Sequence, residues 1–254
     1  MINEEIMDLI SVIIPYFKKK KFIEEAVNSI LSQSYTNIEI LIIYDDKSFE
    51  DLRYLNNIFN SNKKIRIVIN ETNIGAGLSR NKGISLADGK YIGFLDADDY
   101  WHQEKVFKQI KFMKENNLKI SHTSYQMIDE NKNILGVRKA RSFNNYKDLM
   151  KSCDIGLSTV ILEKGLITNE IKFAKLRTKE DFVLWLKLLH SGNTIGALDE
   201  NLVNWRRTNN SLSSSFFQKM SDGFLVYYRY MKFNSFKSLY YLMVLSLNYL
   251  LKNR

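Results

Sequence analysis

Tyr91-Ile92-Gly93-Phe94-Leu95-Asp96-Ala97-Asp98-Asp99 is the stretch that decides the fold. Its first five residues form a short apolar run, typical of a buried strand, and the run leads directly into three acids. Three carboxylates within four residues repel one another unless a cation lies among them, so this strand end is suited to Mn²⁺ or Mg²⁺ and a metal-bound diphosphate. The alternative is a solvated turn that caps a helix starting near Gln103.

Strand and helix patterns alternate upstream of this stretch. We expect strands at residues 11–14, 38–44, 65–69 and 91–95, and helices at 22–31, 52–59 and 79–87. Such alternation with short links predicts an α/β, doubly wound, mostly parallel sheet, in which ligands lie beyond the carboxyl ends of the strands.

Polar residues gather where these strands end. They are Tyr16-Phe17 after Pro15, Asp45-Asp46, the run from Asn73 to Gly77, and the run from Asp96 to Asp99. Four separate segments therefore converge on one rim of the sheet, which predicts a ligand site there.

The residues at this rim have alternative interpretations. A carboxylate of Asp45 or Asp46 is able to accept the imide N–H of uracil or a ribose hydroxyl, or to cap the next helix. Phe17 is either a stacking surface for a base or ordinary core. In the run 73–81, Gly75 lets the backbone approach a ligand, the helix N-terminus favours anions, and Arg80 adds positive charge. The spacing does not fit the G-x-G-x-x-G dinucleotide fingerprint.

The pattern changes after Trp101. We expect a helix at 106–113, a hairpin of strands 120–128 and 134–137, a strand at 158–162, a helix at 182–189 and one or two helices within 216–251. Thr178 is placed as the N-cap of the helix at 182–189. Glu180 and Asp181 lie at the start of that helix, where a carboxylate either deprotonates an acceptor hydroxyl or stabilises the helix dipole.

Charge is unevenly distributed along the 254 residues. The net charge is +9, and the 201–254 segment holds eight basic residues and one acid, Asp222, among many Tyr and Phe. This composition suits the anionic face of a membrane; nucleic acid and an ordinary solvated helical face are the alternatives. The first ten residues do not resemble a signal peptide, no apolar run reaches the length of a membrane span, and Cys153 is the only cysteine, which fits a reducing, cytoplasmic setting.

Taken together, these motifs resemble the family 2 glycosyltransferases, nucleotide-diphospho-sugar enzymes with the GT-A fold. The resemblance runs from Ser11 to about Ser213. It is carried by Ser11-Val12-Ile13-Ile14-Pro15 with Phe17, Ser29-Ile30-Leu31-Ser32-Gln33-Ser34-Tyr35, Tyr44-Asp45-Asp46-Lys47-Ser48, Asn73 to Asn81, and Phe94 to Asp99. Tyr44, Lys47 and Ser79 depart from the family pattern. The stretches 121–125, 153–160 and 177–189 look like the teichuronic-acid-type cell-surface polysaccharide branch.

The resemblance implies roles for individual residues. Asp181, beside Glu180, is the expected catalytic base, Asp46 the uracil contact, Asp98 the metal ligand, and Asp96 lies by the ribose and the metal. The donor-binding set is then Pro15, Phe17, Asp45, Asp46, Asn73, Gly75, Arg80, Asp96 and Arg206. Thr208 stands where many relatives carry a His, and Arg206 or Arg207 is expected to steady the diphosphate instead.

We therefore expect an inverting, metal-dependent enzyme that moves one sugar from a UDP-sugar to a lipid-linked or cell-surface saccharide. The GT-A domain would cover residues 1–215, with a Rossmann-like nucleotide-binding half at 11–100 and an acceptor half at 101–215, and a basic aromatic helical tail would follow at 216–254. The protein would be cytoplasmic and peripheral on the inner membrane face, and no nucleic-acid partner is expected. The alternatives are a non-catalytic nucleotide-sugar-binding or membrane scaffold protein and a nucleotidyltransferase, although the latter needs a Gly-rich loop where Pro15-Tyr16-Phe17 stands.

Overall fold

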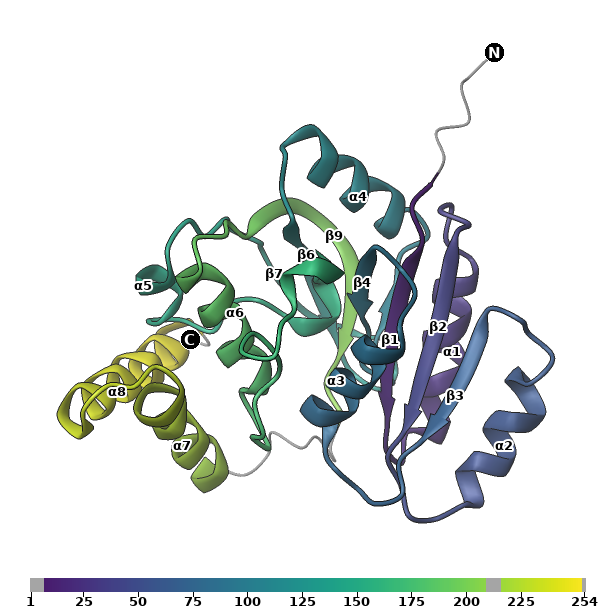
Figure 1. Cartoon of the computed structure of the whole chain (residues 1–254), viewed down its shortest axis with the longest axis horizontal. Coiled ribbons are helices and arrows are strands. Elements are labelled where there is room, and N and C mark those ends of the chain that lie inside the picture. Colours follow the sequence, from purple (N-terminus) through teal and green to yellow (C-terminus); the bar gives the residue numbers. More distant parts are fainter. Residues whose placement is uncertain (1–6, 209–215, 253–254) are drawn as a thin grey trace.

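The computed structural model describes residues 7–208 and 216–252, and a single sheet with helices on both faces forms its centre (Figure 1). The strands are β1 (Ile10–Tyr16), β2 (Ile38–Tyr44), β3 (Ile65–Ile69), β4 (Tyr91–Phe94), β5 (Tyr100–Trp101), β6 (Ile120–Ile128), β7 (Ile134–Arg138), β8 (Ile161–Glu163) and β9 (Gly196–Arg206). The main helices are α1 (Lys20–Leu31), α2 (Glu50–Phe59), α3 (Ala76–Leu86), α4 (Lys105–Glu115), α5 (Tyr146–Leu149), α6 (Glu180–His190), α7 (Phe216–Leu225) and α8 (Ser235–Lys252). Short 3₁₀ turns η1 (Leu157–Thr159) and η2 (Lys164–Leu166) flank β8, and a π-helical turn η4 (Val226–Tyr230) joins α7 toward α8.

The first half of the sheet is parallel, as the sequence predicts. The strand order is β3-β2-β1-β4, and β1 pairs in parallel with both β2 and β4 while β2 pairs in parallel with β3. Because these four strands run in the same direction, the loops that follow them leave the sheet along one edge. The order reverses between β1 and β4, so a ligand crevice is expected next to those two strand ends.

The second half of the sheet has mixed strand directions. β8 pairs antiparallel with β4 and with β6, β6 pairs in parallel with β9, and β7 and β5 pair antiparallel with β6 and β9. The strands predicted at 120–128 and 134–137 are present as β6 and β7. The strand predicted at 158–162 begins later, as β8, because residues 157–159 form the turn η1. β9 is not among the sequence predictions, because Asp199, Glu200 and Asn201 interrupt its apolar pattern where the strand is partly exposed.

Two apolar clusters cover the two faces of the sheet. Neighbouring residues of a strand point to opposite faces, so Ile13 of β1 packs in the cluster that contains α6, whereas Val12 packs in the cluster that contains α1. Phe94 at the end of β4 lies in edge contact with Phe173 and near Trp185 of α6, with ring centroids 5.2 and 6.5 Å away. The strand that leads into the acids is thus fully buried on both faces.

The C-terminal helices α7 and α8 lie together at the side of the molecule farthest from α2, with α6 between them and the sheet (Figure 1). Leu242 and Leu245 of α8 belong to the same buried cluster as α6, and the hydroxyl of Tyr227 donates to the carbonyl of Met150 at 2.6 Å. The expected boundary at residue 215 and the charge of Arg254 lie outside the described residues. Within the described part of the chain, none of the helices has both the length and the apolar character needed to cross a membrane.

Candidate active site

Segments from across the chain meet at the edge where β1 to β4 end. Lys19 follows β1, Asp45 and Asp46 follow β2, the loop from Asn70 to Gly75 follows β3, and Asp96 to Asp99 follow β4. The start of α6 and the end of β9 come to the same place through side-chain contacts described below. The convergence expected from the sequence is therefore present.

Asp45 holds the loop that follows β3. Its carboxylate accepts hydrogen bonds from the backbone N–H groups of Ile74 and Gly75 and from the Asn70 side chain, each at 2.8 Å, and Asn73 donates to its carbonyl at 2.7 Å. Gly75 has φ +85°, a conformation that L side chains rarely adopt. Asp45 is 2% exposed, so in this structure it orders the loop that starts α3.

Ser79 and Tyr44, which depart from the family pattern, both make hydrogen bonds in the structure. Ser79, which replaces a more usual Ala, accepts a hydrogen bond from Asn70 at 3.0 Å and so adds a link between the loop and α3. Tyr44 stacks on Tyr16 with ring centroids 5.4 Å apart, and its hydroxyl donates to the carbonyl of Ser48. Both substitutions fill their sites with hydrogen-bonded side chains.

Arg80 joins the acidic turn after β4 to the start of α6. Its Nη2 lies 2.6 Å from Asp96 Oδ1 and its Nη1 lies 2.8 Å from Glu180 Oε1. The Arg80 residue is 3% exposed, and its Nε has no hydrogen-bond partner among the described residues. The guanidinium also lies over the ring of Phe173, 5.5 Å from the ring centroid. A buried cation shared by two carboxylates fixes the distance between residues that are 84 positions apart in the sequence, since Glu180 and Asp96 bind the same group.

Glu180 and Asp181 differ in what they contact. Glu180 is engaged by Arg80, and burial raises its pKa to about 7, with Arg80 opposing the rise and Asp181 adding to it. Asp181 accepts a hydrogen bond from the N–H of Phe182 at 2.7 Å, which is the sole bond of this carboxylate within residues 7–208 and 216–252. Burial raises the Asp181 pKa as well, and Arg80 opposes that rise. Of the two carboxylates, Glu180 is thus the one in an ion pair with Arg80, and Asp181 is the one held by a backbone N–H.

The start of α6 differs from the expected cap. Lys179 is the N-cap residue, in the left-handed region with φ 62°, and makes no side-chain cap hydrogen bond. The prediction that Thr178 caps this helix is wrong: its backbone N–H and its hydroxyl donate to Asp222 Oδ2 at 2.8 and 2.9 Å. Asp222 belongs to α7 and is 3% exposed. The segment that carries Glu180 and Asp181 is thus tied to the C-terminal helices.

Asp98 lies in a group of three polar side chains. The ammonium of Lys19 is 2.6 Å from Asp98 Oδ2 and donates to Thr208 Oγ1 at 3.0 Å, while the Thr208 hydroxyl is 3.4 Å from the same carboxylate oxygen. Burial raises the pKa of Asp98, and the charge of Lys19 opposes that rise. Thr208, which stands where relatives carry a His, thus does reach Asp98.

Asp99 and Ser158 fix the acidic turn to the second half of the sheet. Asp99 accepts from the Ser158 hydroxyl at 2.6 Å and from the N–H of Arg206 at 2.8 Å. The hydroxyl oxygen of Ser158 also accepts from the N–H of Asp96 at 3.1 Å. The backbone carbonyl of Ser158 accepts from Trp101 Nε1 at 2.8 Å. Asp99 is buried, so its role in this structure is to hold the turn.

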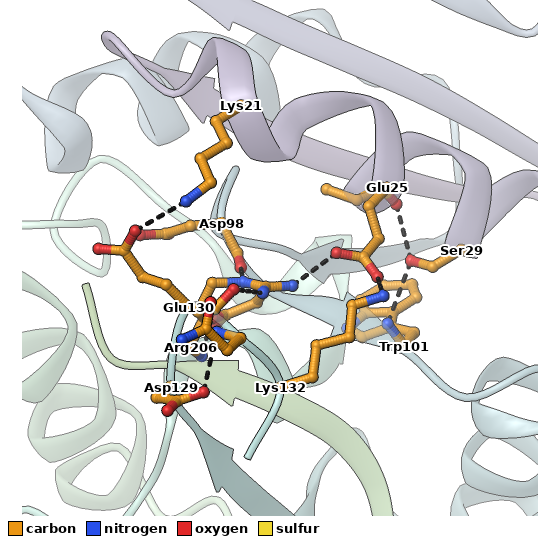
Figure 2. A network of polar contacts seen from close by, with 12 residues as sticks. Lys21, Glu25, Ser29, Asp98, Trp101, Asp129, Glu130, Lys132 and Arg206 are labelled. Atoms are coloured by element: carbon orange, nitrogen blue, oxygen red, sulfur yellow. Dashed lines mark hydrogen bonds and ion pairs between the residues drawn. The ribbon is translucent and has the colours of Figure 1, made fainter.

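Arg206 is held by contacts within the protein. Its side chain is 2% exposed; Nε donates to the carbonyl of Asp98 at 2.9 Å and Nη2 lies 2.5 Å from Glu25, which also pairs with Lys132 at 2.7 Å (Figure 2). Its guanidinium lies over the rings of Phe22 and Tyr100. These contacts place Arg206 as a support for the Asp98 turn, whereas Arg207 is exposed.

The remaining donor-binding candidates lie at the ends of β1 and β2. Phe17 is 36% exposed directly after β1, and Asp46 is 8% exposed with one carboxylate oxygen accepting from the N–H of Ser48 at 3.1 Å. Pro15 lies within β1, opposite Ile43 of β2. The exposed ring of Phe17 and the second oxygen of Asp46 are the groups of this set that remain suited to a ligand.

The acidic turn offers the carboxylates of Asp96 and Asp98 to a metal ion. Among the described residues, no group of three or more His, Cys, Asp or Glu side chains is placed to hold a metal ion. Mg²⁺ and Mn²⁺ are commonly bound by one or two carboxylates together with phosphate oxygens. Asp98 is a partly buried carboxylate paired with Lys19, and Asp96 is paired with Arg80. Two hard oxygen donors of this kind fit such an ion once a diphosphate completes the shell.

Some residues of the site are not among the sequence predictions. Lys19, Ser158, Asn70 and Asp222 each hold a residue of the acidic turn, the loop or the helix start. One of them carries a signal in the sequence, since Asp222 is the only acid of the basic segment 201–254. Its charge therefore sets Asp222 apart from its neighbours in the sequence.

Comparisons with known proteins show the family to which the chain belongs. Residues 11–168 match the family model described as glycosyl transferase family 2. The chain is 34% identical over 222 residues to TuaG of Bacillus subtilis, a glycosyltransferase named for teichuronic acid biosynthesis, and the match covers 86% of this chain and 87% of TuaG. It is 39% identical over 218 residues to WfaP of Escherichia coli, named as a UDP-Glc:alpha-D-GlcNAc-diphosphoundecaprenol beta-1,3-glucosyltransferase, with 84% and 83% of the two chains covered.

Among solved structures, the fold is similar to that of S. aureus TarS residues 1–349 in complex with UDP-GlcNAc. The TM-score is 0.70 at 20% identity, over 92% of this chain and 70% of that one. The likeness establishes the GT-A arrangement of the sheet and helices. With a family match over more than half of the chain and relatives aligned over most of their length, the chain belongs to glycosyl transferase family 2 and is a glycosyltransferase with the GT-A fold.

Proposed function

We propose that this enzyme transfers one sugar from a UDP-sugar to a hydroxyl of a lipid-linked saccharide, with inversion at the anomeric carbon. The name of the relative WfaP supplies the donor and acceptor classes. The observation that carries the proposal is the Arg80 bridge, because one buried guanidinium links Glu180, next to the candidate base, to Asp96 of the acidic turn. Base and diphosphate site are then neighbours, as a direct displacement needs.

In the proposed reaction Asp181 accepts the proton of the acceptor hydroxyl as its oxygen attacks the anomeric carbon. The bond from that carbon to the β-phosphate oxygen breaks, and UDP leaves with the electron pair. Glu180 does not compete for this role because Arg80 engages it. A carboxylate base is effective only when deprotonated, so Asp181 must lose its proton before the acceptor binds productively.

The donor would be held by groups from three strand ends. We propose that Phe17 stacks on the uracil, that Asp46 accepts from the uracil imide, and that Asn73, Gly75 and the α3 N-terminus face the sugar-phosphate part. Asp45 and Arg206 act indirectly in this proposal, since the former orders the loop 70–75 and the latter supports the Asp98 turn. Pro15 fixes the backbone just before Phe17.

We propose that Asp96 and Asp98 hold Mn²⁺ or Mg²⁺. When bound there, such an ion supplies positive charge toward the diphosphate that leaves. Lys19 and Arg80 are the chain's own cations at the same place, and both are within 2.6 Å of these carboxylates. Their positive charges would stabilise the negative charge that develops on the departing diphosphate.

The experiment that tests the proposal is a screen of UDP-sugars for released UDP, with and without undecaprenyl-type diphosphosaccharide acceptors, in Mn²⁺, in Mg²⁺ and after exhaustive chelation. We expect acceptor-stimulated UDP release that chelation abolishes and either ion restores. UDP binding without turnover under every condition would favour the non-catalytic nucleotide-sugar-binding alternative. The nucleotidyltransferase alternative predicts no UDP release in this screen and release of pyrophosphate when UTP and a sugar 1-phosphate are supplied instead.

The setting of the reaction follows from the acceptor class. A lipid-linked acceptor is confined to a bilayer, so we propose that the enzyme works as a peripheral protein at the cytoplasmic face of the cell membrane. The basic segment 201–254 supports this, with eight cationic residues and one acid.

A further inference from the structure

One face of α8 is apolar and exposed. The residues of this face are between 51% and 87% exposed. They are Phe236, Leu239, Tyr240, Met243, Leu247 and Leu250. Spacings of three, four and seven place them in one stripe along the helix, which we call the α8 stripe.

The opposite side of α8 is used by the fold. Ser238 is fully buried, and Leu242 and Leu245 are 7% and 6% exposed in the cluster that also contains Phe182 and Trp185 of α6. An ordinary surface helix has one apolar face, turned to the core. α8 therefore carries a second apolar face that packing within the described residues does not account for.

The charged residues of the segment that carries the α8 stripe have one sign. From Gly223 to the C-terminus the sequence contains five basic residues and no acid. Three of the basic residues, Arg229, Lys232 and Lys237, are exposed. An apolar stripe bordered by cations fits an anionic bilayer, where the stripe enters the boundary between headgroups and acyl chains and the cations meet phosphate groups.

The same charges argue against the alternative occupants. In a symmetric dimer through the α8 stripe, the cations of one copy would face those of the other, and like charges in contact are unfavourable. Nucleic acid would use the cations but would leave six exposed apolar side chains without a partner of their kind. A bilayer with anionic lipids satisfies both features.

The helices that present the α8 stripe are fixed to the catalytic helix. Thr178, two residues before Glu180, donates twice to Asp222 of α7. The ring of Tyr227 lies in edge contact with Phe182 of α6 at 6.4 Å between centroids and stacks on Tyr241 of α8 at 5.6 Å. A surface that rests on α8 is thus held at a set orientation relative to Asp181.

We propose that the α8 stripe docks this enzyme on anionic lipid, with α8 lying in the plane of the bilayer interface and the start of α6 held at a fixed height above it. The inference rests on the proposed function in one respect, namely that a lipid-linked acceptor gives membrane docking its use. Within the basic segment, the α8 stripe is then the surface that contacts the membrane.

The test is co-flotation of the full-length protein with vesicles of phosphatidylcholine alone or mixed with phosphatidylglycerol. The variant Leu239→Gln/Met243→Gln/Leu247→Gln removes the stripe at exposed positions. The matched control Phe49→Gln/Phe107→Gln/Ile134→Gln removes three apolar side chains that are 45% to 67% exposed elsewhere. We expect the wild type and the control to float with the mixed vesicles, and the stripe variant to partition at least about tenfold less. A charge variant, Arg229→Gln/Lys232→Gln/Lys237→Gln, should lose the preference for phosphatidylglycerol.

Three outcomes would overturn the inference. They are a wild type that stays in solution with both kinds of vesicle, a stripe variant that floats like the wild type, and sedimentation showing a wild-type dimer that the stripe variant disperses. UDP release without vesicles is measured on the same samples. Turnover without flotation contradicts the docking surface alone, whereas flotation without turnover contradicts the proposed function alone.

Discussion

The ammonium of Lys19 lies 2.6 Å from the carboxylate of Asp98. Thr208 contacts both groups, so the three side chains form one closed set. A metal ion that binds Asp98 must therefore displace the ammonium of Lys19 from that oxygen. Lys19 thus competes with the proposed metal ion for the Asp98 carboxylate.

We expect Lys19→Met to raise the affinity of the donor-free protein for Mn²⁺. The pair is partly exposed, so the gain should be about fivefold, the equivalent of ~1 kcal/mol. Titration of Mn²⁺ followed by electron paramagnetic resonance measures it directly. Lys18→Met, at the exposed neighbouring position, is the control and should leave the affinity unchanged. Equal affinities for Lys19→Met and the wild type would show that Asp98 does not bind the ion.

Asp181→Asn should lower kcat by a factor of about 10²–10⁴ because the general base is lost. UDP affinity by calorimetry should stay the same, since Asp181 is not among the proposed donor contacts. Burial raises the pKa of Asp181, so the wild-type rate should fall as the pH drops through that pKa. An Asp181→Asn protein that keeps full turnover would assign the base to another residue.

Glu180 predicts how stability depends on pH. Its pKa is raised to about 7 in the folded protein, so between its ordinary unfolded value and 7 the folded state binds more protons than the unfolded state. This group therefore makes the protein less stable as the pH rises through that window. In Glu180→Gln that part of the pH dependence should vanish, which urea unfolding at pH 5, 6, 7 and 8 would reveal. Parallel curves for the two proteins would contradict the raised pKa.

Gly77→Ala should disturb the Arg80 bridge from the α3 side. A Cβ at residue 77 would lie 2.8 Å from Glu180 Cγ and 3.0 Å from the carbonyl of Ala174, so α3 or Glu180 must move. Overpacking of this kind costs about 1–3 kcal/mol of unfolding free energy. Gly165→Ala is the matched control, because nothing lies within 4 Å of a Cβ there. Gly77→Ala should have the lower melting temperature and the slower UDP release of the two variants. Equal values for both variants would mean that the contact at residue 77 relaxes easily.

Asp222→Ala, a substitution in α7, should lower the rate of catalysis. The substitution leaves two buried donors of Thr178 without an acceptor, at about 1–3 kcal/mol for each group, and loosens the segment before Asp181. We expect kcat to fall while the donor KM changes little. Asp222→Asn keeps one carbonyl oxygen in place and should recover much of the rate. If Asn and Ala at this position give the same kcat, Asp222 does not position the base.

The sequence predicts the first half of the fold well because its strands are unbroken apolar runs that end in polar residues. Asp46, Asp96 and Asp98 therefore fall near one edge of the sheet by topology. Asp181 comes to the same edge through the contact of its neighbour Glu180 with Arg80. β9 escapes prediction because acids interrupt it, and its end delivers Arg206 and Thr208 to the acidic turn.

Side-chain partners are the part that sequence patterns do not convey. The resemblance implies that Arg206 contacts the diphosphate, but a long side chain is able to reach many partners. In the fold the Arg206 guanidinium pairs with Glu25 and donates to the carbonyl of Asp98. Thr178 has the chemistry of an N-cap, but Asp222 from a distant helix takes both of its donors. Pairings between residues far apart in the chain depend on packing that local patterns do not encode.

One hydroxyl, that of Ser158, closes both ends of the acidic turn, since it receives the Asp96 amide and donates to Asp99. Ser158 belongs to the short turn before β8, in the half expected to select the acceptor. A change of backbone in the η1 turn would therefore also move Asp96 and Asp99. Under the proposed function, substitutions that alter the choice of acceptor at this turn would then change donor binding as well.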